Sequence, residues 1–345
     1  MISPDCARHY GRERKQTMLD KNFPFYILIF FATFILTFVI EKALVPLLVN
    51  RAQQPIYSEG PKWHEAKSGT PTMGGLAFLI SISVTLAAAS VSMYLGGRWE
   101  IGNAILLTLG YAVLNSLIGL FDDLKKLKKK ENKGLSAKEK LILQGVAAAI
   151  FLIARAFAVD NSTTLSFSFG LLDVGIFYYP AALLILVGIV NMANLTDGID
   201  GLATGVGFAA AVSLFYISAA LVTEVAFISS AVIGAMVGFL FFNINPAKIF
   251  MGDTGSLFLG ALIVSSTFML SNPIVTLSIN SVYIIEGFSV IIQVAYYKLT
   301  KRRLFKMAPL HHHLEKCGWS ENKICFVAIL TTLVTSIPAY ILYVP

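Results

Sequence analysis

The chain has 345 residues, of which 56% are hydrophobic and only 14% are charged, whereas about a quarter of the residues in a soluble domain carry charge. This composition excludes a single soluble core and predicts a membrane protein. The formal net charge of +7 does not indicate nucleic-acid binding, because the basic residues cluster between apolar segments without interleaved aromatic residues. The cysteines Cys6, Cys317 and Cys325 form no C-x-x-C pair, so neither a disulfide framework nor a zinc site is expected.

Ten apolar segments of about 20 residues follow one another along the chain. Because backbone polar groups in lipid must be satisfied within the segment, each one predicts a transmembrane helix. The expected fold is an all-α integral membrane protein with about ten transmembrane helices, in which a single polytopic domain (23–345) follows a basic N-terminal tail (1–22). The predicted spans lie near 23–49, 73–95, 101–121, 141–159, 174–193, 201–221, 225–243, 256–271, 275–298 and 324–343.

Most lysines and arginines fall in the connections that follow the first, third, fifth, seventh and ninth spans. The positive-inside rule places these connections in the cytoplasm, and ten spans then leave both termini outside. The basic tail opposes this assignment, but orientation follows the bias of the whole chain. A start of translation at Met18 would remove most of the tail charge, and this remains an alternative. The charges in the tail are Arg8, Arg12, Arg14, Lys15 and Lys21.

Two acidic clusters adjoin the predicted cytoplasmic ends of spans. Asp122 and Asp123 end the third span, where adjacent carboxylates are costly unless a cation or a proton relieves their repulsion. A solvated helix end neutralised by the following lysines is the alternative. Between the fifth and sixth spans, Asn194, Asp197 and Asp200 recur every three residues, which places them near one face of a helical turn. Their oxygens suit magnesium or a ribose, and a polar turn is the alternative.

Two further motifs lie on the same side. Asp253 directly precedes the eighth span, where Thr254 and Ser256 are candidate caps for a helix start that attracts phosphate; Asp253 as a simple N-cap is the alternative. Three consecutive histidines, 311–313, point in different directions on a helix and do not suit one metal. Imidazoles that contact phosphate oxygens fit better, and a solvated loop is the alternative.

Two smaller features join these motifs. The segment 67–75 combines Lys67, hydroxyl groups and glycines, and it suits a phosphate or nucleotide although it lacks P-loop spacing. Glu286 and Gln293 share one face of the ninth span, where an acid is expected to face the protein interior. Hydrogen bonding within the bundle is an equally good interpretation of this pair.

Taken together, these motifs resemble the phospho-N-acetylmuramoyl-pentapeptide transferases, within the polyprenyl-phosphate N-acetylhexosamine-1-phosphate transferase superfamily. The superfamily shares pieces like FDD (121–123) and NLTDGIDGL (194–202). The segment MAPLHHHLE (307–315), with Gly318 and Trp319, resembles the muramoyl-pentapeptide branch. The basic tail departs from the family, and a start of translation at Met18 is the alternative. The matching segments are KSGTPTMGG (67–75), FDD (121–123), NLTDGIDGL (194–202), FMGDTGS (250–256) and MAPLHHHLE (307–315).

The resemblance implies an enzyme of peptidoglycan biosynthesis in the bacterial cytoplasmic (inner) membrane. Such an enzyme transfers phospho-MurNAc-pentapeptide from UDP-MurNAc-pentapeptide to undecaprenyl phosphate, which forms lipid I and releases UMP. It requires Mg2+ and is expected to form a homodimer. A transferase for another UDP-sugar is the closest rival. A transporter is the rival outside enzymes, but transporter sites lie at the midplane between repeats, whereas these acids gather at inner helix ends.

The same resemblance assigns residue roles. Asp253 is the expected magnesium ligand, with Asp122 and Asp123 as further candidate ligands, and Asp122 is expected to act on the lipid phosphate as base or positioning group. A covalent carboxylate intermediate stays open. His311, His312 and His313 are expected to contact the diphosphate or sugar, and Phe250 to stack on uracil. The remaining expected substrate-binding residues are Lys67, Thr72, Asn194, Asp197, Gly198, Asp200, Asn243 and, more weakly, Gln293.

Overall fold

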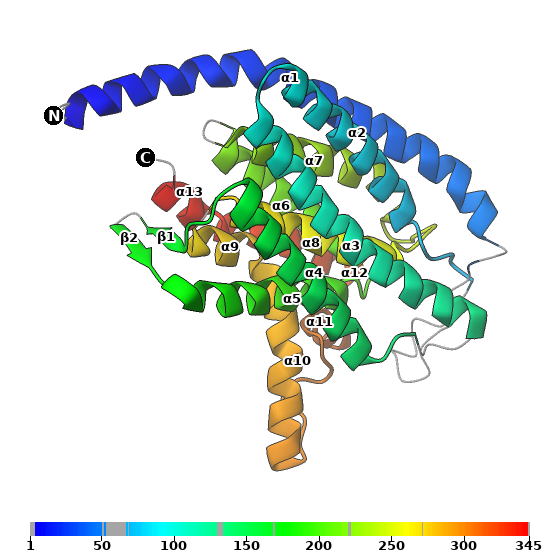
Figure 1. The fold of residues 1–345 in the computed structure, drawn as a ribbon. Helices are drawn as coiled ribbons and strands as arrows, with labels where there is room; N and C mark the ends of the chain where they lie inside the picture. Colours follow the sequence, from blue (N-terminus) through cyan, green and yellow to red (C-terminus); the bar gives the residue numbers. More distant parts are fainter. Residues whose placement is uncertain are drawn as a thin grey trace.

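A computed structural model describes residues 4–49, 52, 67, 69–129, 134–167, 170–219, 222–270 and 272–343. Helices form nearly all of this structure (Figure 1). The only sheet within the described ranges is an antiparallel hairpin of β1 (Thr164–Phe167) and β2 (Gly170–Asp173), followed by a 3-10 helix at Gly175–Phe177. The helices are α1 (Pro4–Leu48), α2 (Gly75–Leu95), α3 (Trp99–Lys129), α4 (Ala137–Ala158), α5 (Tyr178–Thr196), α6 (Leu202–Ser218), α7 (Thr223–Asn243), α8 (Gly252–Phe268), α9 (Pro273–Ile279), α10 (Ser281–Thr300), α11 (Leu310–Lys316), α12 (Glu321–Thr335) and α13 (Ile337–Tyr343).

The predicted all-helical membrane fold is confirmed. Within the described ranges, eight helices are long and apolar enough to cross a membrane. The two other predicted spans, 201–221 and 256–271, correspond to the 17-residue helices α6 and α8. The ninth and tenth predicted spans are each divided, into α9 and α10 near Asn280 and into α12 and α13 near Ser336. The orientation of the bundle and the placement of both termini outside remain predictions. Helix α1 begins at Pro4, so the predicted tail continues into the first helix.

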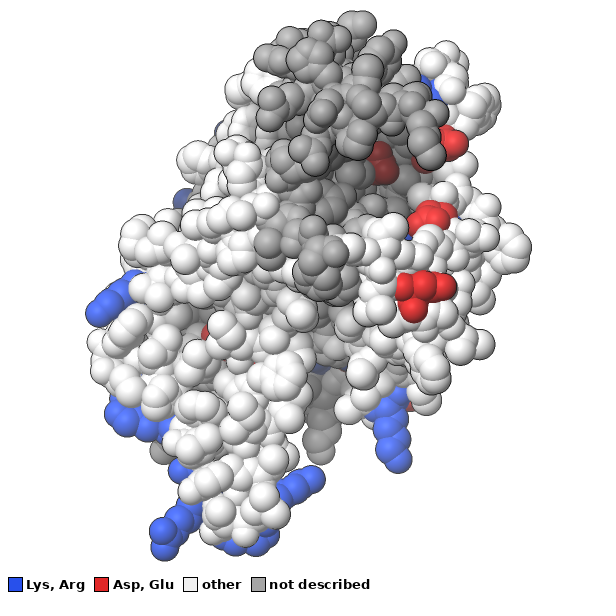
Figure 2. All heavy atoms as spheres, turned by 90° about the vertical axis from the view of Figure 1, so that its left-hand side faces the viewer, with Lys and Arg blue, Asp and Glu red and all other residues white. Residues whose placement is uncertain are grey.

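The surface agrees with a bilayer environment. Figure 2 shows a broad face with few charged side chains at its centre, while Lys and Arg residues gather at its lower edge, the level at which α10 ends in Figure 1. The last turn of α10 and the three residues that follow the helix carry the exposed side chains Lys298, Lys301, Arg302 and Arg303. Many large apolar side chains on the outer helices are exposed, among them Leu28, Phe157 and Leu184. Lipid covers such side chains in a membrane protein.

Helix α8 is the centre of the bundle. Every residue from Thr254 to Phe268 is buried, and a helix that is apolar on all sides belongs inside a protein. Glycines on α2 and α3 allow these two helices to pack closely against the first turn of α8. A Cβ on Gly75 of α2 would lie 2.2 Å from the Cα of Gly255, and a Cβ on Gly119 of α3 would lie 2.2 Å from the carbonyl oxygen of Asp253. Small residues permit this close approach of membrane helices.

Main-chain hydrogen bonds fix the segment that precedes α8. Gly74 N donates to Phe250 O, Gly75 N donates to Met251 O, and Phe250 N donates to Pro71 O. Gly252 has a φ of +69°, which favours glycine, and a Cβ there would lie 2.8 Å from an Asp123 carboxylate oxygen. The start of α2, the start of α8 and the end of α3 therefore meet at one end of the bundle.

Candidate active site

Three carboxylates meet where α3 ends and α8 begins. Asp122 and Asp123 come from the last turns of α3, and Asp253 comes from the first turn of α8. One oxygen from each lies within 4.8 Å of the others. Asp122 and Asp123 are buried, and the Asp253 side chain is 17% exposed. The predicted convergence of the FDD and FMGDTGS motifs is therefore present in the structure.

The three carboxylates differ in their contacts. Asp123 accepts hydrogen bonds from Asp253 N (3.1 Å), Thr254 N (2.9 Å) and Thr254 Oγ1 (2.6 Å). It therefore caps α8 from a neighbouring helix and satisfies amides that a helix start leaves free. The expectation that Thr254 caps α8 is wrong, because its hydroxyl donates to Asp123. Ser256 likewise accepts from Asn194 and donates to Gly252 O.

Two lysines that the sequence analysis did not single out complete the cluster. Lys126 Nζ lies 2.6 Å from Asp122 Oδ2 and 3.0 Å from Asp253 Oδ2. Lys140 Nζ lies 2.7 Å from the same Asp253 oxygen. The negative charges on α3 and α8 are thus balanced by ammonium groups from α3 and α4. The signal in the sequence is the Ser136–Glu139 capping box, which fixes the start of α4 at Ala137, three residues before Lys140.

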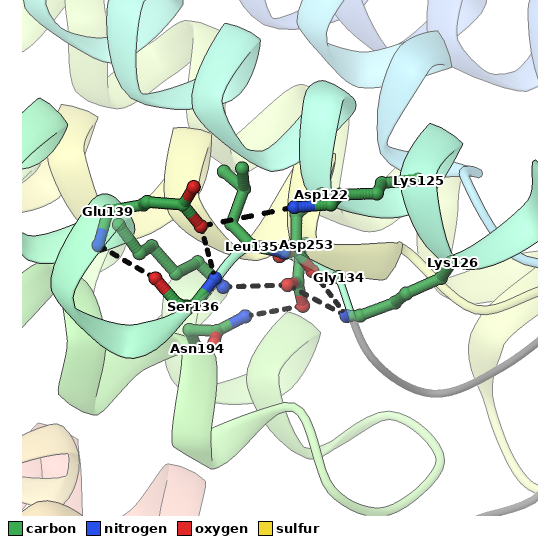
Figure 3. Close-up of a pocket in the computed structure, with 10 residues that line it drawn as sticks. Asp122, Lys125, Lys126, Gly134, Leu135, Ser136, Glu139, Asn194 and Asp253 are labelled. Atoms are coloured by element: carbon green, nitrogen blue, oxygen red, sulfur yellow. Dashed lines mark hydrogen bonds and ion pairs between the residues drawn. The ribbon is translucent and has the colours of Figure 1, made fainter. Parts of the chain in front are cut away.

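These side chains border an open pocket of about 520 Å³. Figure 3 shows Asp122, Lys126, Asn194 and Asp253 pointing toward one another across it. Leu135 N donates to Asp122 Oδ1 at 2.6 Å, so the segment just before α4 closes one side of the pocket. The complete lining is Asp122, Lys125, Lys126, Gly134, Leu135, Ser136, Glu139, Lys140, Asn194 and Asp253.

The donor set fits a divalent cation. Mg2+ and Ca2+ prefer carboxylate oxygens, and Mg2+ is commonly held by one or two carboxylates together with substrate phosphates. Asp253 and Asp122 line the pocket, whereas Asp123 is not among the lining residues and caps the start of α8 with both of its oxygens. Lys126 and Lys140 now contact the Asp253 oxygen, so a bound cation would share or displace these contacts.

The loop after α5 separates residues that the sequence analysis grouped. Asn194 Nδ2 donates to Asp253 Oδ1 (2.9 Å) and Ser256 Oγ (2.7 Å), so it belongs to the acid cluster. Because α5 ends at Thr196, Asp197 and Asp200 lie in a turn, and the expectation of one shared helical face is wrong. Burial, followed by the negative charges of Asp253 and Asp123, raises the pKa of Asp197 to about 8.

Asp200 forms a second charged cluster. Lys67 Nζ lies 2.7 Å from Asp200 Oδ1 and 2.8 Å from Glu321 Oε2. Asp200 N also donates to Glu321, and Asp200 Oδ2 accepts from Asn245 Nδ2. The structure therefore brings the predicted residues Lys67 and Asp200 together. Glu321 was missed because it opens the last span as an ordinary first-turn acid.

Three other predicted residues hold the surrounding frame. Asn243 is buried, accepts from Gly201 N and Thr204 Oγ1, and donates to Ile249 O. Phe250 is half-buried. Thr72 is buried, and its hydroxyl oxygen lies 2.8 Å from where a Cβ on Gly252 would stand.

The segment from α10 to α11 has its own contacts. Gln293 Oε1 accepts from Leu304 N (3.1 Å) and Phe305 N (2.9 Å) and so holds the connection before the histidines. The three histidines diverge, as expected for consecutive helical positions. His311 is fully buried, and its ring lies against Gly198. His312 Nδ1 lies 2.6 Å from Glu315 Oε2, and His313 Nδ1 accepts a hydrogen bond from Lys306 N.

Comparison with known proteins gives consistent matches. The Glycosyl transferase family 4 profile matches residues 104–271, and the phospho-N-acetylmuramoyl-pentapeptide-transferase signature 1 matches residues 67–79. A phospho-N-acetylmuramoyl-pentapeptide-transferase of Halalkalibacterium halodurans is 44% identical over 300 residues, which cover 85% of this chain and 90% of the relative. The proteins of that name in Clostridioides difficile and Bacillus thuringiensis are 39% and 43% identical; the alignments cover 87% and 83% of this chain and 92% and 89% of the relatives.

Proposed function

Because this chain belongs to the phospho-N-acetylmuramoyl-pentapeptide-transferase family, we propose that the pocket between α3, α4 and α8 is its active site. The enzyme is a multi-pass membrane transferase that forms lipid I in peptidoglycan synthesis. Its substrates are UDP-MurNAc-pentapeptide and a polyprenyl phosphate, for which we propose undecaprenyl phosphate. The observation that carries the assignment of the site is the convergence of Asp122, Asp253, Lys126 and Lys140 on one open pocket.

Phosphoryl transfer mainly requires positioning and neutralisation of charge. A phosphate oxygen of the lipid attacks the phosphorus that bears the sugar, the bond to the bridging oxygen breaks, and UMP leaves with that oxygen. Lys126 and Lys140 point into the pocket and would bind the phosphate oxygens. Asp253, with Asp122 as a second ligand, would hold Mg2+. When bound, this ion supplies charge neutralisation at the diphosphate.

Asp122 fits a positioning role best. Its two oxygens already accept from Leu135 N and from Lys126. The carboxylate therefore directs Lys126 toward the place where a lipid phosphate would lie. Asp123 would act through the backbone of Asp253, because its carboxylate accepts a hydrogen bond from Asp253 N.

The nucleotide would bind on the side of the Lys67–Asp200 cluster. Lys67, Thr72, Asn243 and Phe250 surround the meeting point of α2, α7 and α8, and Phe250 would stack on uracil. The diphosphate and sugar would then extend toward the acids. The other residues proposed for this path are Asn194, Asp197, Gly198, Asp200, Gln293, His311, His312 and His313.

The proposed site lies at the cytoplasmic face of the bacterial inner membrane, where a soluble nucleotide and a lipid phosphate can meet. The positive-inside pattern supports this orientation. In the part of the chain that the structure describes, the ends of α3 and α5 lie together with the starts of α2, α4 and α8, around the acids. We also propose a homodimer, on family resemblance alone.

Release of UMP by the detergent-solubilised protein tests this function. UDP-MurNAc-pentapeptide, undecaprenyl phosphate and Mg2+ should together give UMP, and omission of the lipid or addition of EDTA should abolish it. UDP-GlcNAc in place of the donor tests the rival transferase. Release with UDP-GlcNAc alone would move the assignment to another branch of the superfamily. No release from folded protein with either donor would favour a transporter.

Phe250→Ala should mainly raise the KM for the nucleotide, because the substitution removes the proposed stacking surface and keeps the backbone. Loss of one base–aromatic stack, about 1–3 kcal/mol, predicts a rise of roughly 5- to 150-fold. Initial rates over a range of UDP-MurNAc-pentapeptide concentrations measure the change. Phe157→Ala is the matched control, since that ring is 88% exposed at the far end of α4. An unchanged KM in Phe250→Ala would rule out stacking.

A further inference from the structure

Glu286, to which the proposed reaction assigns no role, forms a buried pair with His311. Glu286 lies on α10, and His311 lies in the first turn of α11. Glu286 Oε2 is 3.1 Å from His311 Nδ1 and 3.3 Å from His311 N, so one carboxylate oxygen forms hydrogen bonds with both the ring and the backbone amide of His311. The His311 side chain is 0% exposed and that of Glu286 is 6% exposed. The pair therefore joins α10 to the first of the three histidines out of contact with solvent.

The pair selects one form of the imidazole ring. A carboxylate oxygen only accepts hydrogen bonds, so the ring nitrogen that faces it carries the hydrogen. In a neutral ring, Nε2 then carries the lone pair. This atom is buried and has no hydrogen-bond partner among the described residues. A buried unpaired acceptor destabilises a fold, so packing alone would favour an apolar side chain at this position.

The free nitrogen faces the loop between α5 and α6. A Cβ on Gly198 would lie 2.1 Å from His311 Nε2, a separation that real atoms do not adopt. Gly198 follows Asp197 and lies two positions before Asp200, whose carboxylate binds Lys67. The missing Cβ at Gly198 therefore lets the ring reach the loop backbone. The His311 ring thus links the Glu286 carboxylate on α10 to the loop that carries Asp197 and Asp200.

We infer that Glu286 is a positioning residue for the transfer reaction: it orients His311 with Nδ1–H toward α10 and Nε2, as an acceptor, against the 197–201 loop. This inference rests on the proposed function, because the loop is proposed to bind the donor nucleotide. Glu286 itself does not touch substrate. It holds the ring that sets where Asp197 and Asp200 stand.

A pair of variants of similar size separates the hydrogen bond from packing. Glu286→Met keeps a long side chain without an acceptor, whereas Glu286→Gln keeps an acceptor oxygen without charge. A hydrogen bond to a charged group is worth about 1.5–3 kcal/mol, so Glu286→Met should lower kcat/KM roughly 10- to 150-fold. Glu286→Gln should restore activity to within about threefold of the wild type. Equal activities of the two variants would overturn the inference.

A double-variant cycle tests whether the effect passes through His311. Gly198→Ala alone should lower kcat/KM because the new methyl group displaces the ring. Added to Glu286→Met, it should cost far less, since the ring is already free to move. If the fold-losses in kcat/KM of the two single variants simply multiplied in the double variant, Glu286 and Gly198 would act separately, which would contradict the inference. Gly188→Ala on α5 is the matched control, because a Cβ there meets nothing within 4 Å.

A spectroscopic measurement separates this inference from the proposed function. Nitrogen NMR of histidine-labelled protein should give a signal, absent in His311→Asn, with a protonated Nδ1 and an unprotonated Nε2. Glu286→Gln should keep that signal, and Glu286→Met should lose it. If wild-type protein released no UMP but showed this signal, the orientation of His311 would stand while the proposed reaction would fail. The opposite tautomer in the wild type would overturn the inference whatever the activity.

Discussion

Asp253→Asn should lower kcat for UMP release by about 10³-fold or more, because the substitution keeps the shape of the side chain and removes its charge. The Asp253 carboxylate is the meeting point of Lys126, Lys140 and Asn194. An amide oxygen there still accepts from Asn194, but it neither balances two ammonium groups nor binds a divalent cation well. Initial rates at saturating substrates and increasing Mg2+ measure the effect.

Asp173→Asn is the control for this change. Asp173 lies in β2, on the hairpin that follows the far end of α4. Its carboxylate accepts from Thr163 Oγ1 and Gly175 N, contacts that an amide oxygen can keep. We expect an unchanged kcat for this variant. Near-normal turnover of Asp253→Asn at high Mg2+, in protein with an unchanged thermal midpoint, would remove Asp253 from the reaction.

Gly119→Ala should separate α3 from α8. The added methyl carbon would lie 2.2 Å from the carbonyl oxygen of Asp253, and a backbone atom cannot move aside as a flexible side chain does. Overpacking of this kind destabilises a protein by about 1–3 kcal/mol. It would also move Asp122 away from Asp253, so we expect a lower thermal midpoint and at least a tenfold fall in kcat. Thermal unfolding in detergent and UMP release measure the two effects.

Gly110→Ala is the matched substitution on the same helix. A Cβ at Gly110 meets nothing within 4 Å, and alanine favours a helix interior by about 0.5–1 kcal/mol over glycine. Gly110→Ala should therefore be as stable as the wild type or slightly more stable, with normal activity. If both variants behaved alike, the close approach of α3 and α8 would not matter for the site.

The helices were predictable because a hydropathy window depends only on local composition. The positions at which the helices begin and end were less predictable. The predicted span 275–298 is divided at Asn280, and Asn272 caps the short helix α9 by accepting from Ile274 N. At the division itself, Asn280 Nδ2 donates to Thr276 O, and side-chain bonds to the backbone of this kind compete with helix continuation. Composition does not reveal which state prevails. The central place of α8 also depends on Gly75 and Gly119 of other helices.

The acids of the site were predictable because a carboxylate beside hydrocarbon is costly and calls for a function. The lysines were not, because a basic run at a helix end already has a topological explanation. Which lysine meets Asp253 depends on the tertiary approach of α4, and Lys140 lies 113 positions before that residue. The same holds for Glu321, which lies 121 positions after Asp200. The role of Asp123 as a cap for another helix was likewise invisible in its sequence neighbours.

The length of α8 bears on the depth in the membrane at which the proposed reaction would take place. Seventeen residues extend about 26 Å, somewhat less than the roughly 30 Å of hydrocarbon in a typical bilayer. With α8 along the membrane normal in the proposed orientation, Asp253, in the first turn, would stand near the level where acyl chains give way to headgroups. A lipid phosphate arrives at that level by lateral diffusion and does not have to leave its leaflet, while a water-soluble donor only has to enter the open pocket. Bilayer thickness should consequently influence turnover, since a thicker membrane would bring the headgroups out of register with the acids.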